Sequence, residues 1–367
     1  MIVNQVLLFE YISGGGMGNS ADFEFLISEG FGMLSSLISD FLRLGFGIQV
    51  LIDERVVKRF TQKFNNEIQD QKIRFVVISN EKELPTGLEM LIPSSDFILL
   101  IAPEFSNILM DISALVEAQL HSHQVLLNLP AKAISIFSDK LKSEQYIRSI
   151  GYSTPRSTKI SMKSTMPFTT YENCILKPFD GVGSADTFWV SEQNEIARNV
   201  KISAIIEKFP QHKYILQEKI HGNPLSAFIA CNKGKITYFT INFQTIQFLP
   251  FDQNENIQKL EYLGGYTPFT KISPEIKSTI LNLAETICSQ FQLTGFMGID
   301  FMYDDSCNQY SVVDINPRVT TPYIAISALF KENHDNVVRC LFSDRYVKQI
   351  SGMKSYRKSN KNEIVLN

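Results

Sequence analysis

Cysteine, histidine and tryptophan are scarce in this chain of 367 residues, which contains five cysteines, five histidines and one tryptophan. The cysteines, at positions 174, 231, 288, 307 and 340, are far apart and form no CxxC pair. This spacing excludes the common zinc and iron–sulfur motifs. We therefore expect reduced thiols, most of them in a core.

Long apolar runs and an excess of one charge are also missing. Stretches such as Phe97 to Ala102 fall far short of the ~20 residues that a membrane-spanning helix needs, and Glu10 stands where a signal peptide would be apolar. The 35 basic and 38 acidic residues give a formal charge of −3, which favours neither nucleic acid nor an anionic membrane. We expect a cytoplasmic protein with small-molecule partners and no nucleic-acid or membrane partner, and we leave a homodimer open.

The N-terminal third alternates short apolar segments with helical patterns. Hydrophobic residues make up 44% and charged residues 20% of the chain, which is typical of a folded protein of two or three domains. A glycine cluster follows the first apolar segment, and a helical pattern runs from about Ala21 to Leu44. The pattern predicts an open parallel α/β unit up to about residue 130. Its strands are expected at Val6–Tyr11, Ile48–Ile52, Ile73–Ile78 and Phe97–Ile101.

The rest of the chain has a different pattern. A helical segment from Asp139 to Ile150 ends at Gly151, and from Cys174 onward the turns are spaced as in hairpins. This part is expected to be antiparallel α+β. The segment after Arg345 is basic, which indicates a solvated, partly disordered end rather than a nucleic-acid site.

The most informative segment is a predicted hairpin near residue 300. Its strands are Phe296–Tyr303 and Tyr310–Arg318, joined by a short polar turn. Strand side chains alternate between faces, so Asp314 and Asn316 share a face, and pairing could bring Asp300 beside them. Three oxygen ligands of this kind suit magnesium, and Arg318 could hold a phosphate. The alternative is two ordinary acids beside a turn, although unpaired carboxylates inside apolar strands are costly.

Two other strand ends carry polar residues. Lys177-Pro precedes the glycine-rich turn Asp180–Ser184, whose backbone N–H groups could approach phosphate oxygens; an ordinary hairpin turn would also explain the glycines. The strand Tyr214–Ile220 ends in Gln217-Glu218-Lys219, which could present hydrogen-bonding groups to a purine.

This ordered set of elements resembles the ATP-grasp superfamily of carboxylate ligases over roughly residues 138 to 330. The resemblance implies an ATP-grasp fold after an N-terminal open parallel α/β (pre-ATP-grasp) domain, and ATP and Mg²⁺, or Mn²⁺ in its place, as cofactors. Asp314 stands where the superfamily often has glutamate. The implied residues are Lys140, Lys177, Gly181, Gly183 and Ser184 at the phosphates, Gln217, Glu218 and Lys219 at the adenine, Asp300, Asp314 and Asn316 at the metal, and Arg318 in catalysis.

Within the superfamily the chain is most similar to the tyramine–glutamate ligase group of methanofuran biosynthesis. The segments that carry this similarity are Leu8–Tyr11 with its glycine cluster, Glu29-Gly30, Ala102–Glu104, Ser138–Lys140, Gly264-Gly265 and Asn316–Thr321. The implied domains are a substrate-side domain at 1–137, an N-subdomain with a glycine-rich lid at 138–215, a C-subdomain with the metal site at 216–345 and a basic tail at 346–367. The implied reaction joins the γ-carboxyl of glutamate to tyramine through an acyl phosphate. A ligase for another acid and amine or peptide, or a non-catalytic ATP-binding protein, remains an alternative.

The glycine cluster after the first strand allows two interpretations. Gly16-x-Gly18-x-x-Ala21 fits a loose dinucleotide-binding fingerprint, with Asp53 as a ribose ligand. However, the third glycine is missing and the gap to Asp53 is too long. A substrate loop is favoured, in which Glu10 binds an ammonium group while Gly15 and Gly16 allow close approach; the alternative for Glu10 is an exposed strand-end acid.

Overall fold

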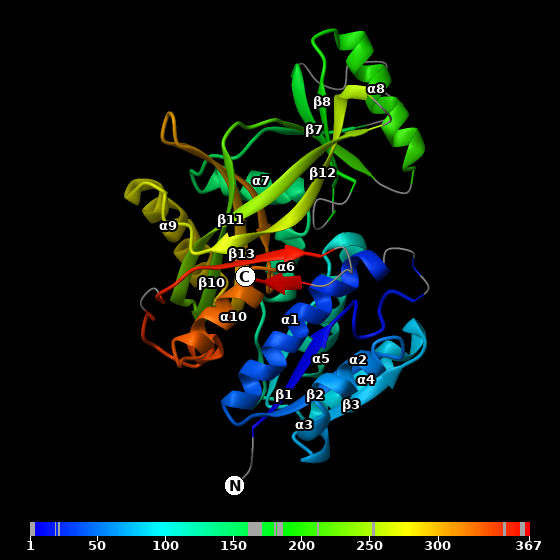
Figure 1. Cartoon of the computed structure of the whole chain (residues 1–367), viewed down its shortest axis with the longest axis vertical. Helices are drawn as coiled ribbons and strands as arrows, with labels where there is room; N and C mark the ends of the chain where they lie inside the picture. Colours follow the sequence, from blue (N-terminus) through cyan, green and yellow to red (C-terminus); the bar gives the residue numbers. More distant parts are fainter. Residues whose placement is uncertain are drawn as a thin grey trace.

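The chain forms a small parallel sheet and a large antiparallel sheet, which extends from beside the parallel sheet to the far end of the molecule (Figure 1). The computed structural model describes residues 4–18, 20, 23–160, 171–179, 181, 186–210, 213–251, 254–347, 350–359 and 364–367. Within these ranges, no helix is long and apolar enough to cross a membrane.

The N-terminal sheet is parallel throughout, as the sequence predicts, with the strand order β3-β2-β1-β4-β5. Its central strands are apolar because helices cover both faces, and β2 is buried along its whole length. The strands are β1 (Gln5–Glu10), β2 (Gly47–Asp53), β3 (Ile73–Ile78), β4 (Phe97–Ile101) and β5 (Val125–Leu126). The accompanying helices are α1 (Phe23–Arg43), α2 (Val57–Lys63), α3 (Asn65–Gln69), α4 (Leu84–Leu91), α5 (Ile108–Gln119) and α6 (Ala131–Phe137), with short 3₁₀ turns η1 (Glu81–Glu83), η2 (Ile92–Ser94) and η3 (Phe105–Asn107).

Helix α1 follows from a regular apolar pattern. Leu34, Leu37 and Phe41 recur at helical spacing and are fully buried. Glu24 in the first turn and Arg43 in the last turn complement the helix dipole. This packing fixes α1 against β1 and β2, with its N-terminal half beside the end of β1.

The large sheet is antiparallel, as expected, and has the strand order β14-β13-β10-β11-β12-β8-β7-β9-β6. Figure 1 shows β7, β8 and α8 far from the parallel sheet, with the long strands β11 and β12 reaching between. The strands are β6 (Ser157–Lys159), β7 (Asn173–Pro178), β8 (Phe188–Ser191), β9 (Tyr214–Glu218), β10 (Asn223–Asn232), β11 (Lys235–Phe251), β12 (Asn254–Thr267), β13 (Gly295–Asp304) and β14 (Gln309–Asn316). The helices are α7 (Lys140–Ser149), α8 (Glu195–Lys208), α9 (Pro274–Gln290) and α10 (Tyr323–Glu332), followed by η4 (Val337–Leu341).

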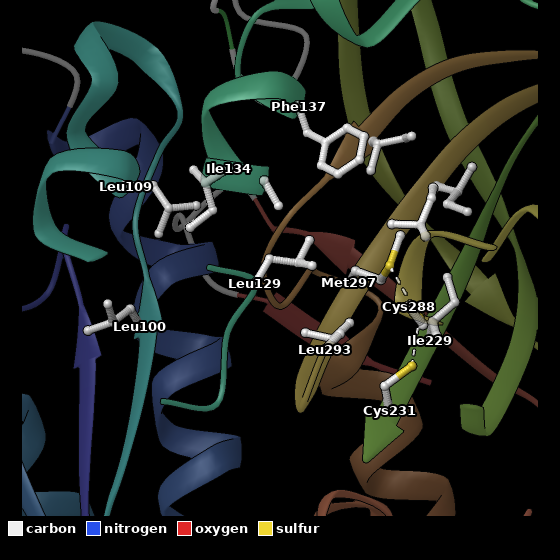
Figure 2. Packing of buried hydrophobic residues seen from close by; sticks show 14 of the residues in the cluster. Leu100, Leu109, Leu129, Ile134, Phe137, Ile229, Cys231, Cys288, Leu293 and Met297 are labelled. Carbon is white, nitrogen blue, oxygen red and sulfur yellow. Dashed lines mark hydrogen bonds between the residues drawn. The ribbon is translucent and has the colours of Figure 1, made fainter. Parts of the chain in front are cut away.

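One hydrophobic cluster runs from the parallel sheet into the antiparallel sheet. Leu100 and Leu129 on one side and Ile229, Leu293 and Met297 on the other belong to it and are fully buried (Figure 2). Burial of apolar surface stabilises this contact by roughly 25 cal/mol per Å². The two sheets are therefore held together by a shared core.

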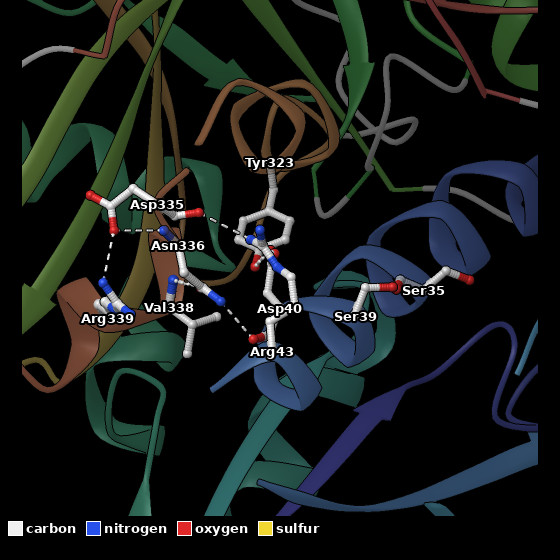
Figure 3. A network of polar contacts seen from close by, with 9 residues as sticks. All are labelled: Ser35, Ser39, Asp40, Arg43, Tyr323, Asp335, Asn336, Val338 and Arg339. Carbon is white, nitrogen blue, oxygen red and sulfur yellow. Dashed lines mark hydrogen bonds and ion pairs between the residues drawn. The ribbon is translucent and has the colours of Figure 1, made fainter. Parts of the chain in front are cut away.

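A buried polar network also joins the N-terminal helix α1 to the C-terminal part of the chain (Figure 3). The Asp40 carboxylate, 2% exposed, accepts hydrogen bonds from the Tyr323 hydroxyl at 2.7 Å and from Arg43 at 2.8 Å. The Asn336 amide donates to the Asp40 carbonyl oxygen at 2.7 Å. Burial raises the pKa of Asp40, and the hydrogen bonds from Tyr323 and other donors oppose this shift.

The C-terminal segment corrects one expectation. Instead of a solvated end, it forms β15 (Lys354–Lys358) and β16 (Ile364–Leu366), and β15 pairs with the end of β12. Tyr356 is 1% exposed. The basic composition suggested a solvated end, but two lysines of β15 pair with acids of other elements: Lys354 with Glu332 at 2.7 Å, and Lys358 with Glu29.

We predict that Tyr323→Phe lowers stability by about 1–3 kcal/mol, because it removes a donor from a buried carboxylate. Calorimetry should show a melting temperature several degrees below that of the unmodified chain. Tyr146→Phe serves as control, since its hydroxyl donates to Gln290 at an exposed position. An equal fall in melting temperature for the two variants would show that the hydrogen bond to Asp40 stabilises the fold no more than an exposed one.

Candidate active site

A pocket of about 500 Å³ lies where the carboxyl ends of β1 and β4 face the large sheet. Ligands commonly bind at this edge of an open α/β sheet. Gly183 and Ser184, like Asp180, lie outside the described residues, and Gly15 and Gly16 are not part of the pocket wall. The predicted site residues that line the pocket are Glu10, Lys140, Lys177, Gly181, Gln217, Glu218, Lys219, Asp300, Asp314, Asn316 and Arg318.

The hairpin β13–β14 brings the three predicted oxygen ligands together. Asp300 and Asp314 are direct partners in the antiparallel register, and Asn316 follows two residues later. The register shifts between Asp300 and Phe301, so that Val313 is an extra residue on β14. Such a bulge reorients the neighbouring side chain and often lies beside an active site.

The two carboxylates are partly buried, and each lies close to the negative charge of the other. Burial raises the pKa of Asp300 to about 6, and the negative charge of Asp314 adds to the shift. The Asp300 oxygens accept hydrogen bonds from the Gln244 amide at 2.9 Å and the Asn316 amide at 2.8 Å. Asp314 accepts one from the Lys140 ammonium group at 2.6 Å. A positive charge beside Asp314 is therefore part of the arrangement.

Lys140 is placed there by the start of α7. The Asp139 side chain accepts hydrogen bonds from the backbone N–H groups of Leu141 and Lys142, which caps the helix. Burial lowers the pKa of Lys140, but the ion pair with Asp314 outweighs this effect, so the net shift is upward. Lys140 thus supplies a positive charge beside the carboxylates of Asp300 and Asp314.

The chemistry of this cluster fits a hard divalent cation. Two carboxylates that face each other need a compensating charge, and carboxylate and amide oxygens are the groups that Mg²⁺ and Mn²⁺ prefer. Across the described part of the chain, no three His, Cys, Asp or Glu side chains gather as a metal site. Two carboxylates, of Asp300 and Asp314, with one amide, of Asn316, leave coordination positions for phosphate oxygens and water.

A second lysine approaches the pocket from the end of β7. Lys177 is 7% exposed, and burial together with the charge of Lys140 lowers its pKa to about 8. Gly181 follows the end of β7 and lies close to Pro178, since an added Cβ would be 3.0 Å from the Pro178 side chain. Two lysines therefore converge with the hairpin carboxylates, as a bound polyphosphate requires.

The end of β9 forms another wall. The Gln217 amide donates to the Ser157 hydroxyl at 3.0 Å, which anchors β9 to β6. The Lys219 ammonium group lies 4.5 Å from the Trp189 ring centroid. Glu218 lines the pocket between them. Apolar side chains such as Ile175 lie near this polar edge, an arrangement that suits a flat base.

Glu10 is buried and lines the pocket, which rules out the exposed strand-end acid. Its carboxylate accepts hydrogen bonds from the Ile12 N–H at 3.1 Å, the Ser13 N–H at 2.7 Å and the Ser13 hydroxyl at 2.6 Å. Burial raises the pKa of Glu10 in spite of these bonds. A Cβ on Gly15, at φ +95°, would clash with Ile78, and one on Gly16 would clash with the Tyr11 ring. Packing of the loop therefore accounts for these two glycines.

The dinucleotide interpretation of this loop finds no support in the structure. Both oxygens of Asp53, the expected ribose ligand, are held by the Arg55 guanidinium at 2.8 and 2.6 Å. A bidentate pair of this kind leaves the carboxylate poorly placed for a ribose.

Several polar residues of the pocket were not predicted as site residues. Glu104 lies 3.0 Å from Arg318, and Glu29 accepts a hydrogen bond from the Thr321 hydroxyl at 2.6 Å. Glu104 could have been found, because it follows β4 at the same sheet edge as Glu10. Gln244 carried no signal in the sequence, since its place depends on the pairing of β10 with β11 and β13.

Two relatives from one organism are similar to this chain in sequence. A protein of Methanocaldococcus jannaschii named uncharacterized is 29% identical over 229 residues, which is 62% of this chain and 51% of that protein. The chain thus spans about half the length of that relative. A tyramine–L-glutamate ligase of the same organism is 24% identical over 324 residues, 88% of this chain and 84% of that protein.

Solved structures share the fold over nearly the whole chain. An ATP-grasp superfamily protein from Archaeoglobus fulgidus matches with a TM-score of 0.66 at 20% identity and covers 99% of this chain and 98% of its own. The biotin carboxylase domain of Hydrogenobacter thermophilus 2-oxoglutarate carboxylase, solved with MgADP, matches with a TM-score of 0.66 at 12% identity, covering 98% and 75%.

Sequence profiles of two domain families match consecutive segments. The pre-ATP-grasp profile matches residues 50–134, on the parallel sheet, and the ATP-grasp profile matches residues 137–322, which contain the hairpin and both lysines. The chain therefore belongs to the ATP-grasp family, with a pre-ATP-grasp domain before its ATP-grasp domain.

Proposed function

We propose that the protein is an ATP-dependent carboxylate–amine ligase that releases ADP and phosphate. The convergence of Lys140 and Lys177 with the paired carboxylates of β13 and β14 in one pocket carries this proposal. As substrates we propose glutamate, through its γ-carboxyl, and tyramine, because a relative that aligns with 88% of the chain is named for them. We also propose that the reaction takes place in the cytoplasm, where ATP is available.

We assign the phosphates, the adenine and the metal ion of the bound nucleotide to separate sets of residues. Lys140 and Lys177 would contact phosphate oxygens, while Gln217, Glu218 and the Lys219 backbone would face the adenine. Asp300, Asp314 and Asn316 would hold Mg²⁺, which when bound supplies charge neutralisation at the phosphates. Lys140 would then turn from Asp314 toward the nucleotide, because a metal-bound carboxylate no longer needs its charge.

The reaction would proceed in two displacements. A carboxylate oxygen of the acid attacks the γ-phosphorus, and the bond to ADP breaks. The ammonium group of the amine first loses a proton, its neutral nitrogen attacks the acyl carbon, phosphate leaves, and the nitrogen loses a second proton; the protons pass to the departing phosphate and to water. Arg318, held by Glu104, would stabilise the phosphoryl oxygens during both steps. The turn Asp180–Ser184 would exclude water from the acyl phosphate.

The activity itself separates the candidate functions. Purified protein with ATP and Mg²⁺ should release ADP only when both glutamate and tyramine are present. ADP release with another acid and amine would support the ligase reaction and contradict the proposed substrates. Nucleotide binding without ADP release for any pair of acid and amine would indicate a non-catalytic ATP-binding protein.

Asp314→Asn should lower kcat by at least about 100-fold, the upper end of what loss of an outer-shell metal partner costs. Asp304→Asn is the matched control. Asp304 is the last residue of β13, at the exposed turn of the same hairpin, where its carboxylate accepts a hydrogen bond from the Ser306 hydroxyl. ADP release is the measurement. Similar rates in the two variants would remove Asp314 from the metal site.

Lys177→Met should weaken ATP binding about 10- to 100-fold, since a charged hydrogen bond contributes about 1.5–3 kcal/mol. Lys159→Met on the exposed strand β6 is the control. Because the pKa of Lys177 is lowered to about 8, its charge is present below that pH and lost above it. Calorimetric affinity of the unmodified chain should thus fall as pH rises through 8, and Lys177→Met should lack this fall; identical pH profiles would contradict the role.

Glu10→Gln should raise KM for glutamate several-fold and leave KM for ATP unchanged, because the carboxylate would pair with the ammonium group of the amino acid. The amide keeps an acceptor for the Ser13 donors, so the loop should remain folded. An unchanged KM for glutamate would contradict the substrate role and leave Glu10 with a structural role in the loop only.

A further inference from the structure

The C-terminal strand β15 reaches the wall of the active site, although it lies beyond both matched family segments. It pairs with the end of β12, so that Tyr356 is opposite Gly265 and Arg357 is opposite Gly264. A Cβ on Gly264 would lie 2.1 Å from the Tyr356 carbonyl oxygen, so only glycine permits this approach. Gly264 therefore allows β15 to pair closely with β12 at this position.

Two side chains of β15 contact residues that line the pocket. The Lys358 ammonium group forms an ion pair with Glu29, and the two side chains are 15% and 14% exposed. The Tyr356 hydroxyl lies 2.9 Å from the hydroxyl of Tyr262. Glu29 and Tyr262 belong to the pocket wall, whereas Lys358 and Tyr356 lie behind them.

Glu29 is held from two sides. One carboxylate oxygen accepts the hydrogen bond from Thr321 at 2.6 Å, and the other pairs with Lys358. A partly buried ion pair fixes a carboxylate more firmly than an exposed one, because solvent screens it less. Glu29 is thus oriented before any substrate binds.

The surroundings of Glu29 indicate what it would bind. Leu26, Gly30 and Met33 lie on the same face of α1 and also line the pocket. Glu10 adds a second carboxylate, which lies against Gly30. An apolar helix face with a carboxylate at its centre suits a primary ammonium group on an apolar body.

We propose that Lys358 is a positioning residue, which holds Glu29 so that its carboxylate receives the ammonium group of the amine substrate. The apolar body of the amine lies across Leu26 and Met33. This assignment rests on the proposed ligase function and extends it to a segment that the matched domains do not include.

The test is the kinetics of Lys358→Met with ATP, glutamate and tyramine. KM for tyramine should rise roughly tenfold, while KM for ATP and for glutamate changes less than about twofold, because only the amine subsite loses its oriented carboxylate. Lys358→Arg should restore the low KM. Lys354→Met is the matched control, since Lys354 lies on the same strand and pairs with Glu332, away from the pocket.

A double-mutant cycle separates positioning from a structural effect. In a Glu29→Gln background, Lys358→Met should add nothing to KM for tyramine, because Lys358 acts through Glu29. An additive rise, an unchanged KM for tyramine, or an equal rise for all three substrates would overturn the inference. A wild-type chain with no acid- and amine-dependent ADP release would instead contradict the proposed function.

Discussion

Two carboxylates that face each other in a buried hairpin set the main constraint on this structure. Asp300 and Asp314 are register partners, and burial together with their mutual repulsion disfavours the charged pair unless a cation is near. Lys140, fixed at the start of α7, provides that charge at 2.6 Å from Asp314. Helix α7 thus begins with the residue that supplies this charge.

The part of the pocket around Glu10 and Glu29 is formed by segments that are distant in sequence. The shared hydrophobic core and the Asp40 network hold α1 against the C-terminal half. Glu29 and Thr321 can therefore form a hydrogen bond in the pocket wall. The β15 strand adds Lys358 from near the chain end. Under the proposed function, the nucleotide would lie against the antiparallel sheet and Lys140 at the start of α7, whereas the acid and the amine would lie between the two domains.

The hairpin was predictable from the sequence because alternation and a polar turn are local signals, and the structure pairs Asp300 with Asp314, as the sequence analysis allowed. The parallel and antiparallel sheets were predicted for the same reason. Gln244 and Tyr262 were not, since non-local strand pairing brings them to the pocket. The C-terminal strand was missed because a basic composition is typical of a solvent-exposed end, whereas the acids that pair with Lys354 and Lys358 lie far away in the sequence, in α10 and α1.

The central claim is that ATP activates a substrate carboxylate as an acyl phosphate, and oxygen transfer tests it most directly. Glutamate labelled with ¹⁸O in its γ-carboxyl group would be incubated with ATP, Mg²⁺, tyramine and the protein, and the phosphate analysed by mass spectrometry. An acyl phosphate predicts one ¹⁸O atom in each phosphate released, since the bridging oxygen leaves with phosphorus. Unlabelled phosphate together with amide product would contradict the account.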